Sequence, residues 1–450
     1  MKGNFLLLLC FPFFCISQNV KGIVTSKTDY TPIENTTVFL RQNGTETRTN
    51  AKGEFSLKLP SGFRENDSIE FSHIGFTTAA FHFDELKKLN FTVSLSESIE
   101  NLSGLTIVAN QKLKLKPKLD FSKLTSIKYP LSSFGSLLTD DKIYIIGGDA
   151  SFDSDAFKKI KYKKPDFTLK DYLDELRSQN TLQLYKDKLF VYDIKTDSWN
   201  DSELKFKKRA YHSLNYYNNT IYVIGGKRSS ANGKFEYLED QIEVFDIANQ
   251  TITIDKTNPH QAANSASFTY KDNIIIMGGS VKMNAENKKK EFTNKVHLYN
   301  ITSGFWYELT NMPIAKEATG ILVADKIYLI GGNNGKPVSK IETYDLNTEK
   351  WTTEGELFNG LEKPAITNHE NLLYFFEDRK MYIYDIKSKV LKEYIVELEL
   401  KASALYYDHN KLYILGGLIE NEYSKVPSAN VYSISIEEFE TTQPNRIKIL

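Results

Sequence analysis

Basic side chains recur just before apolar segments in the C-terminal part of the chain. Arg209, Lys316 and Lys401 precede three of these segments at one equivalent position, with Lys363 nearby and His212 shortly after Arg209. If the segments are repeats around one axis, these cations would meet at its mouth and could bind an anionic group such as a carboxylate. A basic residue at this position can also serve the fold alone, so both roles stay open.

Catalytic, metal and cofactor motifs are weak or absent in the sequence. His82 and Glu85 have the two-ligand spacing of a zinc peptidase, but only His73 lies near them as a further histidine. The other five histidines fall at different positions relative to the repeats. There is no phosphate loop, zincin helix or GxSxG turn. The sequence therefore predicts no cofactor, no metal site and no catalytic constellation.

The segments that must position the cations are repeated strands that end in glycine pairs. Five apolar runs end in such a pair, with the first glycine at Gly147, Gly225, Gly278, Gly331 and Gly416. A degenerate copy ends at Phe376 and Glu377, and the steps run from 40 residues (376 to 416) to 78 residues (147 to 225). Such periods are typical of β-propeller blades, in which glycine lets backbones approach closely near the axis.

An aromatic residue follows each apolar run, joined to an acid or amide in five of the six copies. These residues are Tyr192, Phe245, Tyr299, Tyr344, Tyr384 and Tyr432. Trp199, Trp306 and Trp351 follow three of them, and we expect these rings to fill the space between neighbouring blades. Six landmark pairs predict six blades.

Together the landmarks resemble the kelch family, which implies an all-β fold, a six-bladed kelch-type β-propeller. The pattern is eroded where Phe376-Glu377 replaces a glycine pair and where Ser433 replaces the acid. Ring closure usually takes one strand from the far end of the chain. We expect residues 119–126 as the outer strand of the sixth blade, with the tail after Ile436 as the rival.

Two kinds of kelch enzyme bear on the function that this resemblance implies. Galactose-oxidase-like copper enzymes need a cysteine linked to a tyrosine, and the only cysteines here, Cys10 and Cys15, lie in a segment that we expect to be removed. Sialic-acid epimerases are exported kelch propellers, and a cationic axial pocket would suit an acidic sugar. An acidic-sugar epimerase therefore stays an alternative function.

The N-terminal part shows short strand-like runs between turn residues and predicts a small antiparallel β-sandwich. The runs are 20–24, 37–40, 54–59, 68–72 and 91–95. Four segments are notable: Gly22-Ile-Val24, Thr31-Pro32-Ile33, Gly53-Glu-Phe55 and Gly75-Phe76. They resemble the carboxypeptidase-regulatory-like (transthyretin-like) domain of Bacteroidetes envelope proteins. The family usually has Asp and Tyr where this chain has Asn50 and Phe76. There the domain is an accessory module, so the resemblance implies no catalysis.

The first 17 residues have the pattern of a cleavable signal peptide, with Lys2, an apolar run over 5–16 and the small residue Ser17. We therefore expect export to the periplasm or the outer membrane, with the extracellular space as an alternative. The chain has 57 basic and 57 acidic residues, so no net field favours nucleic acid. No later apolar run is long enough for a transmembrane helix.

The expected organisation is a signal peptide (1–17), a sandwich (18–97), a polar, Lys-rich linker (98–118) and a propeller (119–450). Loops between second and third strands share a face with the blade connections, and they are long after Gly148, Gly226, Gly279 and Gly417. The largest, over 149–186, contains a basic stretch and a predicted helix at 171–178. It could be a solvated decoration or a partner-binding element.

We therefore expect a non-catalytic binding or scaffold protein of the bacterial cell envelope. The loop-rich propeller face would bind a protein or glycan partner, with Arg209, His212, Lys316, Lys363 and Lys401 as candidate ligand-binding residues. The acidic-sugar epimerase is the alternative, and a purely structural role is a third. The sequence predicts no oligomeric state.

Export with cleavage after Ser17 predicts a mature protein that begins at Gln18 and contains no cysteine. N-terminal sequencing and thiol titration of the purified, exported protein check this. A retained N-terminal segment with a titratable thiol would contradict it.

Overall fold

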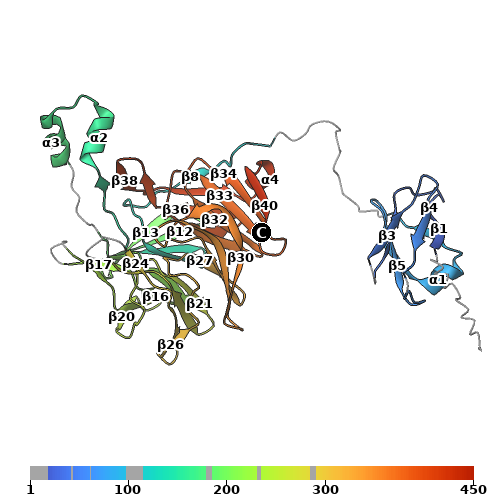
Figure 1. Cartoon of the computed structure of the whole chain (residues 1–450). Helices are drawn as coiled ribbons and strands as arrows, with labels where there is room; N and C mark the ends of the chain where they lie inside the picture. The colour runs from blue at the N-terminus through green and yellow to red at the C-terminus, as the bar shows by residue number, and fades with distance from the viewer. Residues whose placement is uncertain are drawn as a thin grey trace, which may run out of the picture. The chain divides into compact units, whose positions relative to one another are not determined.

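The computed structural model describes residues 19–41, 44–60, 62–97, 115–178, 185–230, 235–283 and 290–450 (Figure 1). The expected signal peptide, with both cysteines, and most of the expected linker lie outside these residues. The chain divides into two compact units, Met1–Gln111 and Lys112–Leu450, and each is described by itself. Among the described residues, no helix is long and apolar enough to span a bilayer.

The N-terminal unit is a β-sandwich, as the sequence predicted. One sheet has the order β4 (Glu54–Lys58), β1 (Asn19–Ser26), β7 (Thr92–Leu95). The other has the order β3 (Thr45–Arg48), β2 (Thr37–Leu40), β5 (Ser68–Ser72), β6 (Ala79–His82). Alternate residues such as Phe55 and Leu57 are buried in a common core. One pairing differs from the expected antiparallel pattern, because β1 and β7 run parallel.

The His82 and Glu85 pair belongs to a helix cap in this sandwich. Glu85 Oε2 accepts a hydrogen bond from the His82 backbone N–H at 2.8 Å, at the start of α1 (Phe83–Lys88). His82 Nδ1 lies 3.0 Å from the Asn66 carbonyl oxygen. The spacing that resembled a zinc motif is therefore explained by local helix geometry.

The C-terminal unit is a β-propeller with six blades, each built on four antiparallel strands. From the innermost strand outwards, blade 1 is β9 (Gly135–Thr139), β10 (Lys142–Ile146), β12 (Lys188–Asp193) and β13 (Ser198–Lys205). Blade 2 is β15 (Ser213–Tyr217), β16 (Thr220–Ile224), β19 (Ile242–Asp246) and β20 (Thr251–Asp255). Blade 3 is β21 (Ala266–Tyr270), β22 (Asn273–Met277), β25 (Val296–Asn300) and β26 (Trp306–Leu309).

Blades 4 to 6 follow the same order. Blade 4 is β27 (Gly320–Val323), β28 (Lys326–Ile330), β29 (Val338–Asp345) and β30 (Lys350–Leu361). Blade 5 is β31 (Ala365–His369), β32 (Leu372–Glu377), β33 (Lys380–Asp385) and β34 (Val390–Ile395). Blade 6 is β35 (Ala404–Asp408), β36 (Lys411–Leu415), β39 (Val431–Ser435) and β8 (Ser122–Leu124).

The strand β8 closes the ring, which confirms the first of the two sequence-based candidates. It pairs with β39 as the outer strand of blade 6. The rival, the C-terminal tail, instead forms β40 (Arg446–Ile449) and adds a fifth strand to blade 5. Buried Glu393 holds this strand, because its Oε1 accepts hydrogen bonds from Asn445 Nδ2 at 2.7 Å and Arg446 Nε at 2.9 Å.

The three tryptophans join neighbouring blades, as their spacing predicted. Trp351 stacks obliquely on Tyr344 of its own blade at 4.7 Å between ring centroids, and its Nε1 donates to the Thr310 carbonyl of the preceding blade at 3.2 Å. Trp306 Nε1 donates to the Thr257 hydroxyl oxygen, and Trp199 Nε1 to the Thr125 carbonyl just after β8. Each indole thus packs on one blade and hydrogen-bonds to the one before it.

Each glycine pair contacts the segment that enters the next blade. The N–H of the second glycine donates to the carbonyl of the residue four positions before the next innermost strand. These bonds are Gly148 to Arg209, Gly226 to Ala262, Gly279 to Lys316, Gly332 to Leu361 and Gly417 to Leu131, at 2.8–3.0 Å. A Cβ on the first glycine would lie 2.6–2.9 Å from the same carbonyl oxygen, too close for any other residue. We call this contact the blade junction.

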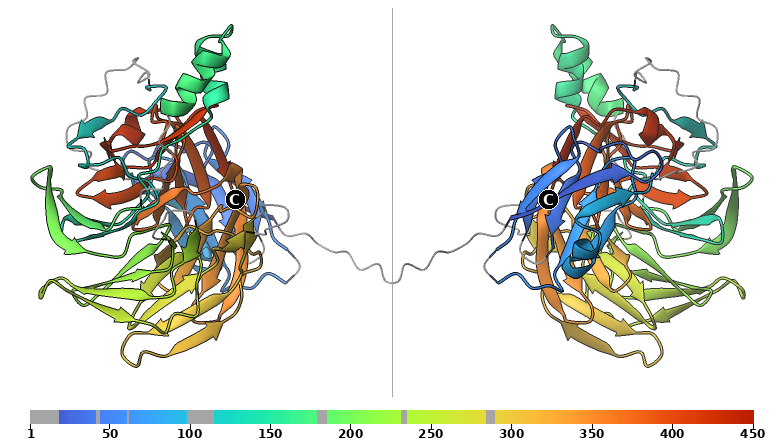
Figure 2. Two further views of the ribbon diagram at one scale, coloured as in Figure 1. Left: turned by 90° about the vertical axis from the view of Figure 1, so that its left-hand side faces the viewer. Right: turned by 90° about the vertical axis from the view of Figure 1, so that its right-hand side faces the viewer.

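The long loops after the glycine pairs carry secondary structure of their own. They contain β11 (Asp153–Ser154), α2 (Ala156–Lys163), α3 (Leu169–Ser178), β17 (Lys227–Ser229), β18 (Glu236–Leu238), β23 (Ser280–Met283), β24 (Lys290–Phe292), β37 (Leu418–Glu420) and β38 (Ser424–Pro427). The predicted helix is α3, whereas α2 was seen only as a basic stretch. Both helices project beyond the blades (Figure 2). The remaining short elements are β14 (Arg209–Ala210) and α4 (Glu438–Thr441).

Replacing Gly331 by Ala should destabilise the propeller by at least about 2 kcal/mol more than replacing Gly304 by Ala. Both glycines have similar positive φ, +64° and +72°. Only at Gly331 would the new Cβ meet a carbonyl oxygen, that of Leu361, whereas nothing lies within 4 Å at Gly304. Urea unfolding of the two variants measures the difference, and equal losses would contradict the role of the blade junction.

Candidate functional site

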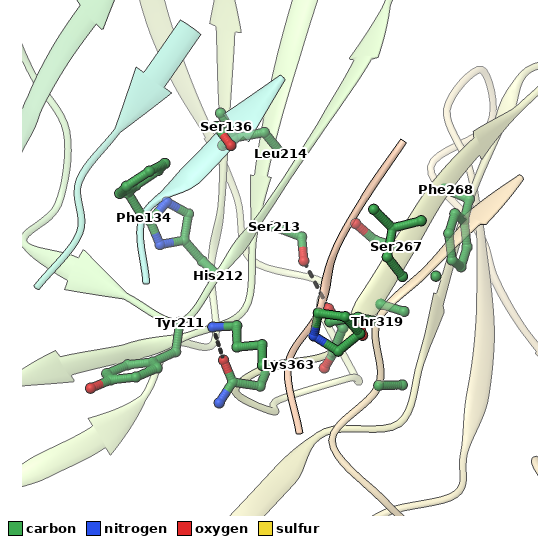
Figure 3. Close-up of a pocket in the computed structure, with 17 residues that line it drawn as sticks. Phe134, Ser136, Tyr211, His212, Ser213, Leu214, Ser267, Phe268, Thr319 and Lys363 are labelled. Atoms are coloured by element: carbon green, nitrogen blue, oxygen red, sulfur yellow. Dashed lines mark hydrogen bonds between the residues drawn. The ribbon is translucent and has the colours of Figure 1, made fainter. Parts of the chain in front are cut away.

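A pocket lies at the propeller axis, where the blade connections reach the innermost strands (Figure 3). It has a volume of about 240 Å³ and is lined by 17 residues of blades 1 to 5. Because blade connections and the loops between second and third strands emerge on one face, this axial pocket belongs to the loop-rich face. Its polar lining includes Tyr211, His212, Asn264, Thr319 and Lys363.

Residues two positions before each innermost strand form a collar around the axis. They are Ser133, Tyr211, Asn264, Ala318, Lys363 and Ala402. The three large polar members contact one another. Lys363 Nζ donates to Asn264 Oδ1 at 2.7 Å and lies 5.6 Å from the centroid of the Tyr211 ring. The Tyr211 hydroxyl donates to Asp149 Oδ2 at 2.9 Å. Lys363 of blade 5, between the small Ala318 and Ala402, thus reaches across the axis to Asn264 and Tyr211 of blades 3 and 2.

The wall below the collar is rich in hydroxyl groups. Ser213 Oγ donates to the Ser265 carbonyl at 2.9 Å, Ser265 Oγ to the Gly278 carbonyl at 2.9 Å, and Thr319 Oγ1 to the Ile330 carbonyl at 3.3 Å. Since each of these protons is directed to the backbone, the oxygen lone pairs remain as acceptors. Such a wall can accept hydrogen bonds from the hydroxyl groups of a ligand.

The backbone of Lys363 is held by Glu377, the residue that replaces a glycine of the repeat in blade 5. The Glu377 carboxylate accepts hydrogen bonds from the backbone N–H groups of Glu362 at 2.9 Å and Lys363 at 2.7 Å. Burial lowers the pKa of Lys363 to about 8, against the opposing effect of nearby Glu317. Lys363 is therefore a candidate cation that lines the axial pocket, and burial there disfavours its charged form.

His212 also lines the axial pocket, but its ring is part of the wall. Its Nε2 accepts a hydrogen bond from the Gly135 backbone N–H at 3.2 Å. Burial, followed by the charge of Arg209, holds the pKa of His212 well below its ordinary value. A neutral imidazole thus positions the innermost strand of blade 1.

Arg209 and Lys316 do not meet at the axis as expected. Both side chains are fully buried inside their blades, where Arg209 Nη2 lies 2.7 Å from Glu243 Oε2 and Lys316 Nζ lies 2.6 Å from Glu342 Oε2. Lys316 Nζ also donates to the Gly331 carbonyl. Each cation ties the third strand of its blade to the incoming segment, because a buried charge needs a paired carboxylate. The expected ring of cations is thus not formed.

Lys401 does not occupy the position of Arg209 and Lys316, because the sequence alignment was shifted by one residue in blade 6. The residue equivalent to Arg209 is Leu400, whose carbonyl accepts a hydrogen bond from the Asp378 N–H at 2.9 Å. Lys401 Nζ instead contacts Glu420 Oε2 at 2.9 Å on the half-exposed hairpin of β37 and β38. Of the five predicted residues, only Lys363 and His212 line the axial pocket.

Sequence reasoning missed the other polar groups of the axial pocket, including Tyr211, Asn264 and the hydroxyl wall. Their signal is positional: they stand one or two residues before each innermost strand, or in its first residues. An alignment on the start of the innermost strand, rather than on charge, would have found them.

One group of possible metal ligands occurs among the described residues, away from the axial pocket. Asp141, Asp408 and His409 lie close together at two hairpin turns of blades 1 and 6. Lys195 Nζ lies 2.6 Å from Asp141 Oδ2, and His409 Nδ1 lies 2.7 Å from Asp408 Oδ2. These contacts account for the three side chains as surface ion pairs.

Replacing Lys316 by Met should cost about 3–5 kcal/mol of unfolding free energy, because Glu342 would remain buried and uncompensated. The double variant Lys316→Met with Glu342→Leu should recover most of this loss. Urea unfolding measures both. If Lys316→Met left stability unchanged, a structural role for Lys316 would be contradicted.

Family models match both units. Residues 20–107 match a CarboxypepD_reg-like domain, and residues 177–385 match the KLHDC2/KLHL20/DRC7 Kelch-repeats domain. The solved structure of YjhT is similar in fold, with a TM-score of 0.50 and 13% identity over 69% of this chain and 99% of YjhT.

Curated relatives are similar over part of their length. Alpha-scruin of Limulus polyphemus is 24% identical over 194 residues, which are 41% of this chain and 20% of alpha-scruin. Kelch-like protein terF of Aspergillus terreus is 20% identical over 239 residues, which are 52% of this chain and 46% of terF. Human Kelch-like protein 15 is 24% identical over 178 residues, which are 36% of this chain and 28% of that protein. This chain thus spans from a fifth to about half of these relatives, and it consists of a carboxypeptidase-regulatory-like domain followed by a Kelch-repeat β-propeller.

Proposed function

We propose that this protein is a non-catalytic binding or scaffold protein of the bacterial cell envelope, whose loop-rich face binds a protein or glycan partner at the axial pocket. One observation carries the proposal. The axial pocket offers one lysine, one amide and several hydroxyl groups, and none of its 17 described lining residues is Asp or Glu. Such a site can hold a polar group, but it presents no carboxylate as a general base.

The volume of the axial pocket limits what enters it. About 240 Å³ is below the ~300–1,000 Å³ of typical pockets for drug-sized ligands. A single sugar residue or one side chain of a larger partner is the expected occupant. Lys363 would donate to a carbonyl or anionic oxygen, and the hydroxyl wall would accept from ligand hydroxyls.

The loops around the axial pocket supply area for a larger partner. Exposed aromatic residues occur on several of them: Tyr162 on α2 is 70% exposed, and Phe235 and Tyr237 at β18 are 60% and 47% exposed. Aromatic side chains are enriched at protein interfaces because they bury large areas at low entropic cost. Kelch propeller domains generally mediate protein binding, which supports the same reading.

The alternative function is an epimerase of an acidic sugar. It is favoured by one observation, the neutral imidazole of His212 in the same pocket as the Lys363 cation. Against it, His212 Nε2 already accepts the Gly135 N–H, and a base must be free to take a proton from the substrate. Binding without turnover is therefore the better-supported function.

Export underlies the proposed location in the periplasm or at the outer membrane, with the extracellular space as the alternative. It is supported by the basic, apolar and small residues of the first 17 positions. The carboxypeptidase-regulatory-like domain would then serve as a spacer or docking module.

A glycan and envelope-protein binding screen of the mature protein tests the proposal, with Lys363→Met and Lys195→Met as matched variants. Lys195 is exposed on the opposite face and pairs with Asp141. Loss of a hydrogen bond to a charged group is worth ~1.5–3 kcal/mol, so Lys363→Met should weaken binding ~10-fold or more. Lys195→Met should have no effect.

Two results would contradict the proposal. A partner that binds Lys363→Met as tightly as the wild type would place the site elsewhere. Mutarotation of an acidic sugar by the wild-type protein, lost in Lys363→Met, would favour the epimerase instead.

A further inference from the structure

Lys363 differs in its partner from the two fully buried cations, Arg209 and Lys316. Arg209 and Lys316 each contact a carboxylate, Glu243 or Glu342, at 2.7 and 2.6 Å. Lys363 Nζ contacts the neutral amide oxygen of Asn264 at 2.7 Å, and no ion pair joins it to any carboxylate of the described residues. An amide oxygen carries no negative charge, so it stabilises the ammonium form of Lys363 less than a carboxylate would.

The consequence is a lysine with a substantial fraction of neutral amine near neutral pH. With a pKa of about 8 in place of 10.5, about a tenth of the Lys363 amines are unprotonated at pH 7, against about 0.03% for an ordinary lysine. A desolvated, neutral lysine amine is a nucleophile toward carbonyl carbon.

The surroundings of Lys363 suit a small hydroxylated ligand. Lys363 lines the axial pocket and also a smaller adjoining cavity of about 160 Å³. Ser213, Ser265 and Thr319 line the axial pocket, and Ser403, whose buried Oγ has no hydrogen-bond partner, lines the smaller cavity. Ser213 and Thr319 are labelled beside Lys363 in Figure 3. A carbonyl compound placed at Lys363 could thus extend in both directions along hydroxyl-bearing walls.

We propose that Lys363 captures small hydroxylated aldehydes or ketones, such as open-chain sugars, as a reversible imine. This inference rests on the proposed binding function and names the chemical class of its ligand. The Nζ lone pair forms a bond to the carbonyl carbon while the carbonyl π pair moves to oxygen, and a proton passes from nitrogen to oxygen. Loss of water, which takes the hydroxyl and the second amine proton, then leaves the C=N bond. The sequence of steps needs no oxidant or reductant.

The test is reductive trapping on the wild-type mature protein with D-glyceraldehyde and sodium cyanoborohydride, followed by peptide mapping between pH 6 and 10. The reductant serves only to make the imine permanent. At pH 7 we expect Lys363 to be modified at least ~10-fold faster than exposed Lys195, because of its larger neutral fraction. Its rate should reach half of its maximum near pH 8.

Two further lysine-based controls sharpen the result. Lys316 is fully buried and contacts Glu342, so it should remain unmodified and show that burial alone does not create reactivity. The variant Lys363→Arg keeps a positive charge but cannot form an imine, and it should lose the selective adduct.

Modification of Lys363 no faster than Lys195, or a rate that still rises steeply from pH 9 to 10, would overturn the imine. If a partner nevertheless binds without reductant, the proposed binding function stands and only this inference fails. Selective trapping in a protein that binds no glycan or protein would support the imine and contradict the binding function.

Discussion

The blade junction is the constraint on which the rest of the propeller depends. At each of the six junctions a backbone N–H after an apolar strand donates to the carbonyl four residues before the next innermost strand. In five of them the first residue is a glycine whose Cβ, if present, would meet that carbonyl. The junction fixes the path of the segment that follows the carbonyl. Residues two positions further on therefore turn toward the axis in every blade, which is how Tyr211, Asn264 and Lys363 reach one collar. The fold and the axial pocket are two consequences of the same contact.

The fifth blade shows how one departure from the repeat creates a functional feature. Asp378 keeps the junction by donating its N–H to the Leu400 carbonyl, so the blade still connects to its neighbour. Glu377, which replaces a glycine, uses its buried carboxylate to hold the backbone of Glu362 and Lys363. The residue that departs from the sequence pattern thus holds the backbone of the lysine in the axial pocket. Proteins often depart from their local sequence rules at functional sites, and Glu377 is such a departure.

Much of the fold could be predicted from the sequence, because its signals are local and repeated. The glycine strands, the tryptophans, the closing strand and the helix α3 all carry their own residue pattern. The direction of the basic side chains could not be predicted. Whether Arg209 points to the axis or into its blade depends on Glu243, which is supplied by the third strand of that blade. Lys316 depends on Glu342 in the same way. The parallel pairing of β1 with β7 likewise depends on packing across the sandwich rather than on either strand alone.

The central claim is that the axial pocket contains a half-buried lysine, Lys363, without a carboxylate partner among the described residues. The most direct measurement is an NMR titration of the mature protein with lysine labelled at 13Cε and 15Nζ, with the Lys363 signal assigned from Lys363→Arg. We expect Lys363 to titrate with a pKa of about 8, well below the value of about 10.5 for lysine in model peptides. A Lys363 signal that titrates together with the exposed lysines would contradict the account, because it would mean that the amine is solvated or paired.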